Sequence, residues 1–335
     1  MSDASPPQAG DRIHLAGTEV AIPPLGVGTW AWGDKGTWGM GGYDQSLTES
    51  TIREAWEASI EAGVVLFDTA EIYGGGESER IMGRLLAADP GVRNRIVIAS
   101  KFMPSPWKVN VRAALLSAAR DSRERLGTDV IDLYQIHGPV SLRSHDALAE
   151  ALATAHAEGI VRAVGVSNYS AKETRAMDVA LRRRDLRLAS NQIEFSLLRA
   201  MPLRAGLISA CRELGVVPLA YSPIGQGRLT GKYSAANPPP KGRSFSAHPM
   251  AEVDTIVALL RSIGEAHGDR TPSQVALAWL MAQGAVPIPG AKNGEQARQN
   301  AGALGWHLTA EELNLLTQAS LYGTRTIQQR FWQHG

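Results

Sequence analysis

Short apolar segments alternate along the chain with longer segments in which apolar residues recur every three or four positions. The short segments are apolar on both faces, which is typical of strands buried in a parallel sheet. We therefore predict eight strands, at Leu25–Gly28, Val64–Asp68, Ile96–Lys101, Ile131–His137, Ala163–Ser167, Ala189–Glu194, Val216–Tyr221 and Ala285–Pro289.

The longer segments have the amphipathic pattern of helices that cover such a sheet. The predicted helices are Thr48–Ala62, Ser78–Leu86, Val109–Leu126, Ser144–Glu158, Ala171–Arg184, Leu203–Leu214 and Met250–His267, and Asn293–Gly302 follows the last strand. At the start of the first helix, Ser46–Glu49 reads Ser-Leu-Thr-Glu, which has the spacing of a capping box.

Eight strand–helix units in a chain of 335 residues favour a closed (β/α)8 barrel, or TIM barrel. An open, doubly wound sheet is the structural alternative. That fold normally carries a phosphate-binding glycine fingerprint after its first strand. Here the first predicted strand is followed by Trp30-Ala31-Trp32-Gly33, which is not that fingerprint, so we expect the barrel.

Three segments are expected outside the barrel repeat. Arg12–Ile22 is a predicted β-hairpin with its turn at Ala16-Gly17 or Gly17-Thr18, and it is suited to plug the amino-terminal end of the barrel. Thr271–Gln283 and Thr309–Leu321 are predicted additional helices. The first of them begins with a Thr-Pro pair, which predicts an N-cap followed by proline in the first turn.

No linker or change of composition divides the chain. The polar, proline-rich residues 1–10 are expected to form a disordered lead-in, and residues 11–335 a single barrel domain. The triple proline at Pro238–Pro240 lies in a long loop after the seventh strand, and long loops on this rim of a barrel commonly contact ligands.

Composition narrows the functional classes. With 34 basic and 33 acidic residues the net charge is +1, and no basic stripe points to nucleic acid or to a membrane surface as a partner. Cys211 is the single cysteine, which excludes an intramolecular disulfide and a cysteine-based zinc site. Neither a signal-peptide pattern nor an apolar run of roughly 18–20 residues is present, so we expect a cytoplasmic protein.

Four reactive side chains lie at or just after predicted strand ends: Asp68, Tyr73, Lys101 and His137. The steps from Asp68 to Lys101 and from Lys101 to His137 are 33 and 36 residues, and Ser167 follows after 30 more, so repeated strand–helix units would place these residues on one rim. Alone, each has an ordinary interpretation as a helix cap, a packing residue, an exposed strand end or a rim histidine. Together they can protonate a carbonyl oxygen. A lysine beside the tyrosine would stabilise its phenolate and lower its pKa, the acid would hold the lysine, and the histidine would hydrogen-bond the substrate oxygen.

The order of several motifs resembles the aldo-keto reductase family over nearly the whole chain, from about residue 11 to 321. The matching segments are Phe67–Gly74, Lys101, Leu133–His137, Gly165–Asn168, Asn191-Gln192, Tyr221–Pro223 and Ile288–Lys292. The resemblance implies that Tyr73 is the proton donor, that Lys101 and Asp68 tune it, and that His137 orients the carbonyl. Gly28–Asp34 and Pro287–Trp306 are most similar to plant-chloroplast and cyanobacterial members of the pyridoxal-reductase type.

Members of this family bind NADPH across the barrel rim without a Rossmann domain. The resemblance implies that Ser167, Asn168 and Gln192 hold the nicotinamide carboxamide and that Tyr221 stacks on its ring. A primary amide needs both donors and acceptors, which these side chains offer. In isolation, the same residues would be a helix cap and a packed strand-end aromatic.

The remaining cofactor contacts implied by the resemblance concern the phosphates and the adenosine. Ser222, Pro223, Ile224, Gly225, Gly227, Leu229 and Lys232 resemble the loop that covers the pyrophosphate, and Gly290, Lys292, Gln296 and Asn300 match positions near the 2′-phosphate and adenine. Lys292 favours NADPH over NADH. Asn293 departs from the family pattern, in which a hydroxyl or a second basic residue is common, and Arg298 is a candidate to compensate. Gly74–Ser78 lacks the ending of a P-loop and is predicted to be a tight strand–helix connection.

Trp30, Trp32, Trp38 and Trp107 fall in predicted rim loops, where they suit either an apolar carbonyl pocket or loop packing. We take Trp30, Trp32 and Trp107 as candidate pocket residues. The expected function is NADPH-dependent reduction of an aldehyde or ketone, pyridoxal among them, by a monomer or weak homo-oligomer that needs no metal. The alternative is a sensor or regulatory subunit that binds NADPH with little turnover, since fold alone does not decide function.

Overall fold

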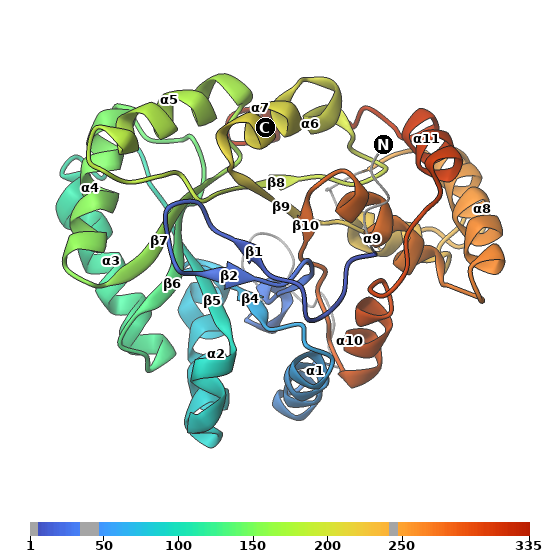
Figure 1. Ribbon diagram of the computed structural model, residues 1–335, viewed down its shortest axis with the longest axis horizontal. Coiled ribbons are helices and arrows are strands. Elements are labelled where there is room, and N and C mark those ends of the chain that lie inside the picture. Colours follow the sequence, from blue (N-terminus) through green and yellow to red (C-terminus); the bar gives the residue numbers. More distant parts are fainter. Residues whose placement is uncertain (1–5, 34–46, 241–246) are drawn as a thin grey trace.

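The computed structural model describes residues 6–33, 47–240 and 247–335, and its centre is a sheet of eight parallel strands (Figure 1). The strands are β3 (Gly26–Gly28), β4 (Leu66–Asp68), β5 (Val97–Phe102), β6 (Ile131–Ile136), β7 (Val161–Ser167), β8 (Ser190–Glu194), β9 (Val217–Tyr221) and β10 (Val286–Pro287). The Gly28 N–H donates to the Pro289 carbonyl at 3.1 Å, and Gly28 forms a parallel bridge with Gly290. Because these contacts join the first strand to the last, the predicted (β/α)8 barrel is confirmed.

Helices alternate with the strands and cover the outside of the sheet (Figure 1). They are α1 (Glu49–Glu61), α2 (Glu77–Ala88), α3 (Val111–Leu126), α4 (His145–Ala157), α5 (Ala171–Arg182), α6 (Met201–Arg204), α7 (Leu207–Leu214), α8 (Met250–Ala266), α9 (Pro272–Ala282), α10 (Gly294–Ala301), α11 (Ala310–Ala319) and α12 (Ile327–Arg330). Their inner faces form the main hydrophobic core with the outer faces of the strands.

The start of α1 corrects one sequence prediction. Thr48 is the N-cap, and its hydroxyl accepts the Thr51 N–H at 3.2 Å within a capping box. The box predicted at Ser46–Glu49 is wrong, because Glu49 already lies inside the helix, and Ser46 itself is outside the described residues.

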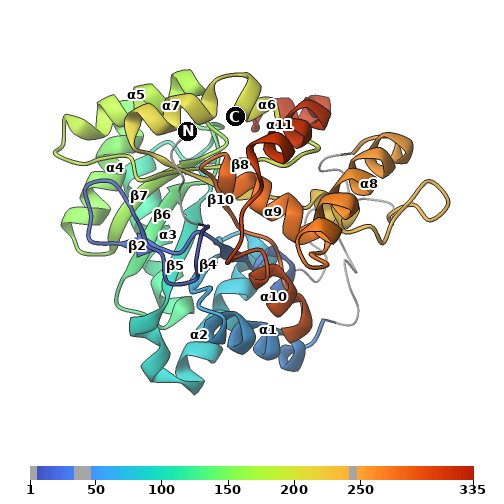
Figure 2. The same ribbon diagram turned by 45° about the vertical axis from the view of Figure 1, so that its right-hand side comes forward.

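Helix α9, and not α8, takes the last helix position before β10. It leads directly into β10 and packs against that strand and against α10. In both views α8 lies farther from the strands, with α11 beside it (Figures 1 and 2). The prediction that the helix at 271–283 lies outside the repeat is therefore wrong. Its sequence is apolar nearly all round, as a helix enclosed on several sides requires, whereas its predicted cap, Thr271 followed by Pro272, is confirmed.

A hairpin closes the amino-terminal end of the barrel, as predicted. It pairs β1 (Ile13–His14) with β2 (Ala21–Ile22), and the Thr18 N–H donates to the Leu15 carbonyl across a turn centred on Ala16-Gly17. Gly17 supplies the φ of +73° that this turn needs. The buried cluster under the hairpin contains Leu15, Val20, Ile22, Leu66, Ala99, Leu133, Ala163, Ala189, Val217, Leu219, Val286 and Ile288.

Residues 6–10 contact the rest of the chain. The Gly305 N–H donates to the Pro7 carbonyl at 2.8 Å, and Ala9 packs against the main core. The prediction that residues 1–10 form a disordered lead-in is therefore wrong for residues 6–10. Residues 1–5 lie outside the described part of the chain.

Side chains that face the barrel interior change from apolar to polar along the strands. Alternate residues of a strand point to the same face. The pairs that show the change are Leu66 and Asp68 in β4, Ala99 and Lys101 in β5, and Leu133 and Gln135 in β6. The apolar members lie under the hairpin, and the polar members collect at the carboxyl end of the barrel, where this fold carries its active sites.

Candidate active site

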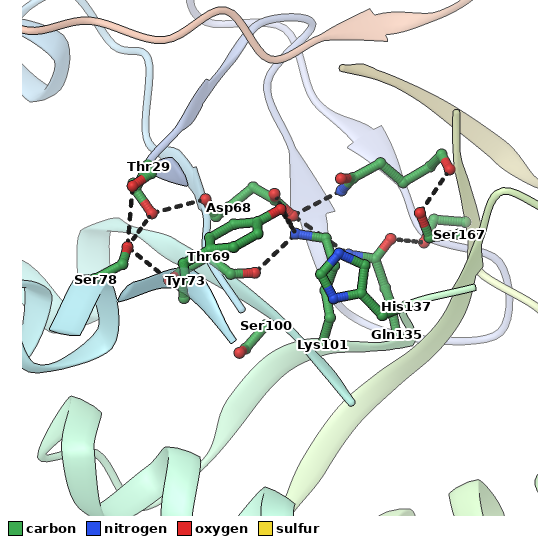
Figure 3. Close-up of polar contacts among 12 residues, drawn as sticks. Thr29, Asp68, Thr69, Tyr73, Ser78, Ser100, Lys101, Gln135, His137 and Ser167 are labelled. Carbon is green, nitrogen blue, oxygen red and sulfur yellow. Dashed lines mark hydrogen bonds and ion pairs between the residues drawn. The ribbon is translucent and has the colours of Figure 1, made fainter. Parts of the chain in front are cut away.

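The centre of the site is a buried ion pair between Asp68, the last residue of β4, and Lys101 in β5 (Figure 3). The Lys101 Nζ lies 2.5 Å from Asp68 Oδ1, and both side chains are almost completely buried. Nζ also donates to the Thr69 carbonyl at 2.8 Å and to the Tyr73 hydroxyl at 3.1 Å. Since an ammonium group has three protons, all of them are used and Lys101 is held in one position.

The second oxygen of Asp68 accepts two side-chain amides. Gln192 Nε2 lies 2.7 Å and Gln135 Nε2 lies 3.3 Å from Asp68 Oδ2. A buried charge pair is stable only when its remaining hydrogen-bonding positions are filled, and these two amides fill them. Gln135 is a site residue that we did not predict. The available signal was a polar residue at an inward strand position, two residues before His137.

A glycine in β7 makes room for the hydrogen-bond partner of Gln135. The Ser190 hydroxyl donates to Gln135 Oε1 at 3.2 Å. Gly165 lies between them in the sheet register, and a Cβ at Gly165 would lie 2.2 Å from Ser190 Oγ. Only glycine at this position lets Ser190 reach across, so the match at Gly165–Asn168 includes a packing requirement.

Tyr73 reaches the ion pair from a tight loop after β4. Gly74, Gly75 and Gly76 have φ values of +59°, +62° and +88°, which are costly for residues with a Cβ. A Cβ on Gly74 would lie 1.8 Å from the Gly33 carbonyl oxygen. The segment is therefore the tight strand–helix connection that we predicted, and it turns the Tyr73 hydroxyl onto Lys101 (Figure 3).

Buried hydroxyl groups fix both ends of this loop (Figure 3). The Thr29 hydroxyl donates to the Asp68 carbonyl at 2.9 Å, and its oxygen lies 2.7 Å from Ser78 Oγ. The Thr69 hydroxyl donates to the same Ser78 oxygen at 2.9 Å. Because Ser78 lies in the first turn of α2, the end of β4 and the start of α2 are tied together on either side of Tyr73.

Tyr73 keeps its proton at neutral pH. Burial raises the pKa of Tyr73 above its ordinary value, while Lys101 lowers it and Asp68 raises it, and the net direction is upward. Burial alone would lower the pKa of Lys101, but Asp68 and Tyr73 raise it above its ordinary value. Lys101 lowers the Tyr73 pKa, as expected, but desolvation of the phenolate outweighs the nearby positive charge, so the pKa is raised overall.

His137 follows β6 and faces Tyr73. The two ring centroids are 5.7 Å apart and the rings are nearly perpendicular, at 77°. Burial, and then the positive charge of Lys101, lower the pKa of His137 well below its ordinary value, so the ring is neutral at pH 7. Its buried Nδ1 has no hydrogen-bond partner within the described residues. A neutral imidazole offers one donor and one acceptor, so His137 can hydrogen-bond an oxygen placed beside Tyr73.

The residues expected to hold the nicotinamide lie together at the ends of β7, β8 and β9. The Ser167 hydroxyl donates to the Gln192 carbonyl at 2.9 Å, and Asn168 Nδ2 donates to Ser167 Oγ at 3.1 Å. The Tyr221 hydroxyl donates to Asn168 Oδ1 at 2.9 Å. Because Gln192 also donates to Asp68, this amide cluster adjoins the ion pair directly.

The residues expected at the pyrophosphate lie in the loop after β9, where Pro223 and Ile224 lead into a 3₁₀ turn at Gly225–Thr230. Ser222, Gly225 and Gly227 have φ values of +49°, +58° and +90°, so the backbone turns sharply. Leu229 is fully buried and anchors the turn, whereas Lys232 is exposed. The Pro238–Pro240 stretch follows in the same loop.

The residues expected near the 2′-phosphate lie before and within α10. Asn300 Nδ2 donates to the Gly290 carbonyl at 3.2 Å, and Gln296 Oε1 accepts the Lys292 N–H at 3.1 Å. Asn293 is the N-cap of α10, and its Oδ1 accepts the Gln296 N–H at 2.9 Å. Asn293, which departs from the family pattern, thus stabilises the start of α10 as its N-cap.

Arg298 folds back toward the first turn of α10. Its Nη1 lies 3.2 Å from the position that a Cβ on Gly294 would take. The residue is exposed, and because Gly294 is the first residue of α10, the Arg298 guanidinium lies at the N-terminal end of this helix, two residues after Lys292 in the sequence. Arg298 therefore stays a candidate to contact a 2′-phosphate beside Lys292.

The candidate pocket tryptophans have different surroundings. Trp32 is 3% exposed, its Nε1 donates to the Ala291 carbonyl at 2.8 Å, and its ring packs near Phe67. The assignment of Trp32 to a pocket is therefore corrected to loop packing. Trp30 is partly exposed and Trp107 is 78% exposed, so both can meet a ligand, and Trp38 lies outside the described residues.

The barrel carries these four polar side chains at its carboxyl end, and the chain belongs to the aldo/keto reductase family, a family of oxidoreductases, whose model matches residues 24–320. It is 35% identical over 327 residues to the chloroplastic pyridoxal reductase of Arabidopsis thaliana, with 94% of this chain and 87% of that protein covered.

Two solved structures have the same fold. A thermostable aldo-keto reductase in complex with the inhibitor epalrestat aligns with a TM-score of 0.74 and 29% identity, covering 92% of this chain and 99% of that chain. An aldo/keto reductase from Klebsiella pneumoniae in complex with NADP and acetate aligns with a TM-score of 0.68 and 28% identity, covering 92% and 94%. In the part of the chain that the structure describes, no helix is both long and apolar enough to cross a membrane.

Proposed function

We propose that this protein reduces aldehydes or ketones to alcohols with NADPH and that Tyr73 donates the proton. The observation that carries the proposal is the Lys101 ammonium, which is held by Asp68 and Thr69 and directs its third proton at the Tyr73 hydroxyl. This arrangement keeps a protonated phenol beside a fixed positive charge, as general-acid catalysis at a developing alkoxide requires. Membership of the aldo/keto reductase family supports it.

The residues of the chain divide the chemistry between them. When bound, the nicotinamide supplies a hydride to the carbonyl carbon. Tyr73 gives its proton to the carbonyl oxygen, and Lys101 stabilises the phenolate that remains. Neutral His137, whose ring faces Tyr73, donates a hydrogen bond to the same oxygen and orients it. Electrons and protons balance, because one hydride and one proton convert the carbonyl to an alcohol.

The side chains at the ends of β7–β9 fit the nicotinamide. Asn168 offers a donor to the carboxamide oxygen, and the Ser167 hydroxyl oxygen and the Gln192 amide offer acceptors to the carboxamide nitrogen. Tyr221 is partly exposed, so its ring face is available for stacking. The left-handed backbone at Ser222, Gly225 and Gly227 suits a pyrophosphate, and Lys292 with Arg298 at the N-terminus of α10 suits a 2′-phosphate. The cofactor complex of the Klebsiella pneumoniae relative supports this.

The carbonyl substrate class that we favour is an aromatic aldehyde. Trp30 and Trp107 are the exposed or half-exposed candidates on the rim, and Trp aromatic faces suit a flat, apolar ligand. Pyridoxal belongs in this class, and the similarity to a chloroplastic pyridoxal reductase supports testing it first.

The test is NADPH consumption, followed at its absorbance, with a panel of small and aromatic aldehydes that includes pyridoxal. Turnover is the expected result. Tight NADPH binding without turnover on any aldehyde would favour the alternative of a sensor or regulatory subunit.

Replacing the acid tests the mechanism. Tyr73→Phe is expected to lower kcat by roughly 10²–10⁴-fold, because it removes the transferable proton. The cofactor is held elsewhere, so NADPH binding should change little. Tyr322→Phe is the matched control, since Tyr322 is 54% exposed and is not one of the four residues Asp68, Tyr73, Lys101 and His137, which we call the tetrad. A Tyr73→Phe enzyme with wild-type kcat, in a reaction limited by chemistry, would show that Tyr73 is not the acid.

A further inference from the structure

The segment that follows α12 crosses the cofactor end of the site. The N–H groups of His334 and Gly335 both donate to the Asn168 carbonyl at 3.0 Å. Arg199 Nη2, in a fully buried side chain, donates to the Gly335 carbonyl at 2.7 Å. The segment is therefore hydrogen-bonded to the backbone of a residue that we assign to the nicotinamide.

Gln333 lies in this segment and is completely buried. Its Nε2 donates to Glu194 Oε2 at 2.8 Å and to the Tyr221 hydroxyl oxygen at 2.7 Å. Glu194 ends β8 and Tyr221 ends β9, and the two residues are paired in the sheet register. Gln333, which follows the last helix of the chain, thus links the ends of the neighbouring strands β8 and β9.

The chemistry of these groups fixes the direction of every hydrogen bond. A carboxylate accepts only, so the atom of Gln333 that faces Glu194 must be the amide nitrogen. The same nitrogen donates its second proton to the Tyr221 hydroxyl. That hydroxyl must then turn its own proton to Asn168 Oδ1, at 2.9 Å. As a consequence, Asn168 turns its Nδ2 toward Ser167 Oγ at 3.1 Å and toward the His137 carbonyl at 3.3 Å, and these two contacts use both amide protons.

The opposite orientation of the Gln333 amide is disfavoured by charge. It would place an oxygen against the Glu194 carboxylate, which also lies 3.6 Å from Arg199 Nε. The observed orientation is kept although Gln333 Oε1 is buried with no hydrogen-bond partner in the described part of the chain. Leaving that acceptor unpaired costs roughly 1–3 kcal/mol. In the opposite orientation, Gln333 would lose both hydrogen bonds that its Nε2 donates, and its Oε1 would be repelled by the Glu194 carboxylate.

We propose that Gln333 is a positioning residue for the nicotinamide: through the Tyr221 hydroxyl it sets which atom of the Asn168 amide faces the carboxamide. The inference rests on the proposed function, because it presumes that Asn168 and Tyr221 hold the nicotinamide. A carboxamide oxygen needs a donor, and the relay from Glu194 through Gln333 and Tyr221 supplies Nδ2 and not Oδ1. A bound carboxamide oxygen would take the Nδ2 proton that otherwise goes to the His137 carbonyl, the longer of its two contacts at 3.3 Å. The same contacts keep the Tyr221 ring from turning.

The experiment compares two ligands on Gln333→Met, which preserves length and removes both donors. The ligands are NADPH and adenosine 2′,5′-bisphosphate, which lacks the nicotinamide, and protein fluorescence follows both titrations. Loss of the relay is expected to weaken NADPH about 10-fold, which matches the free energy of one hydrogen bond. Binding of the bisphosphate should be unchanged. The matched control is Gln328→Met, because Gln328 is an exposed glutamine of α12, just before this segment.

A double-mutant cycle with Tyr221→Phe separates positioning from simple docking of the segment. Tyr221→Phe keeps the ring but ends the relay, so Gln333→Met should add little further loss of NADPH affinity to it. Additive losses, equal losses for both ligands, or no loss in Gln333→Met would overturn the inference. If Gln333→Met does not fold, Tyr221→Phe alone must show the NADPH-selective loss. If the wild-type protein binds NADPH no more tightly than it binds the bisphosphate, the nicotinamide adds nothing to binding, and this result would instead contradict the proposed function.

Discussion

At the scale of single residues, the tetrad depends on a lysine whose charge is enclosed. Lys101 has no solvent contact and directs its protons at a carboxylate, a carbonyl and a phenol. Burial therefore raises the pKa of Tyr73 and keeps it protonated, whereas Lys101 lowers this pKa. The balance between these two effects sets the pH range over which the acid works.

Lys101→Met tests that balance. Lys101 lowers the pKa of Tyr73, so its removal should raise this pKa further and move the alkaline loss of activity to higher pH. The phenol becomes a weaker acid and kcat should fall. A full pH profile of kcat, measured beside wild type, gives both results. Full activity with an unchanged profile would remove Lys101 from the mechanism.

The same variant leaves Asp68 buried without its counter-ion, which typically costs about 3–5 kcal/mol of unfolding free energy. Asp68→Asn combined with Lys101→Met removes both charges and should recover much of this loss in urea unfolding. Activity should stay low in the double variant. Recovery of activity together with stability would mean that the lysine acts only through folding.

At the scale of elements, the two ends of the barrel have separate tasks. The hairpin of β1 and β2 seals the amino-terminal end with Leu15, Val20 and Ile22, and the polar residues lie at the opposite end. Short segments that are apolar on both faces were enough to predict the barrel strands, and the turn residues at Ala16-Gly17 were enough to predict the hairpin. It did not show which of the helices at 250–267 and 271–283 lies against the barrel, because both are apolar enough to be buried and the difference lies in their neighbours.

Leu15→Ala should therefore weaken the fold and spare the chemistry. Truncating a fully buried leucine costs about 2–5 kcal/mol, depending on how far the cavity collapses. Urea unfolding should show this loss, while kcat at low denaturant stays near wild type. Glu19→Ala, an exposed change in the same hairpin, serves as control. A drop in kcat without loss of stability would place the hairpin in the mechanism.

The N-terminus of α10 is the element that we expect to choose the cofactor. Lys292→Ala should weaken NADPH far more than NADH, because a charge-assisted hydrogen bond is worth roughly 1.5–3 kcal/mol, or on the order of 10- to 100-fold in affinity. Salt should shrink the preference. Titration of each protein with both cofactors measures it, with the exposed Lys172→Ala as control.

Arg298 lies at the same helix end and is expected to retain part of the preference, so Lys292→Ala with Arg298→Ala should lose more than either alone. Equal weakening of NADPH and NADH in Lys292→Ala would show that Lys292 contacts a shared part of the cofactor or supports the fold.

At the scale of the whole molecule, the site is assembled from parts of the chain that sequence reasoning treats unequally. The tetrad could be predicted because each member lies at or just after a strand end, and strand ends in a parallel barrel share one rim. Gln135 lies inside a strand, where a polar residue signals burial but not its partner. Gln333 follows the last predicted helix, and no local pattern shows that the chain returns from there to β8 and β9.

Asp68 contacts both the proposed acid and the proposed cofactor site, so we expect cofactor binding and proton binding to be coupled. Its Oδ1 holds Lys101 and its Oδ2 holds Gln192, which we assign to the carboxamide. A ligand that draws on the Gln192 amide changes the hydrogen bonding of Asp68 and thereby the acidity of Tyr73. Such coupling is reciprocal, so the affinity for NADPH should vary with pH where Tyr73 ionises, and by the same factor the bound enzyme should titrate at a different pH from the free one. Cofactor titrations across alkaline pH would reveal this linkage, and a pH-independent affinity would show that the two ends of the carboxylate act separately.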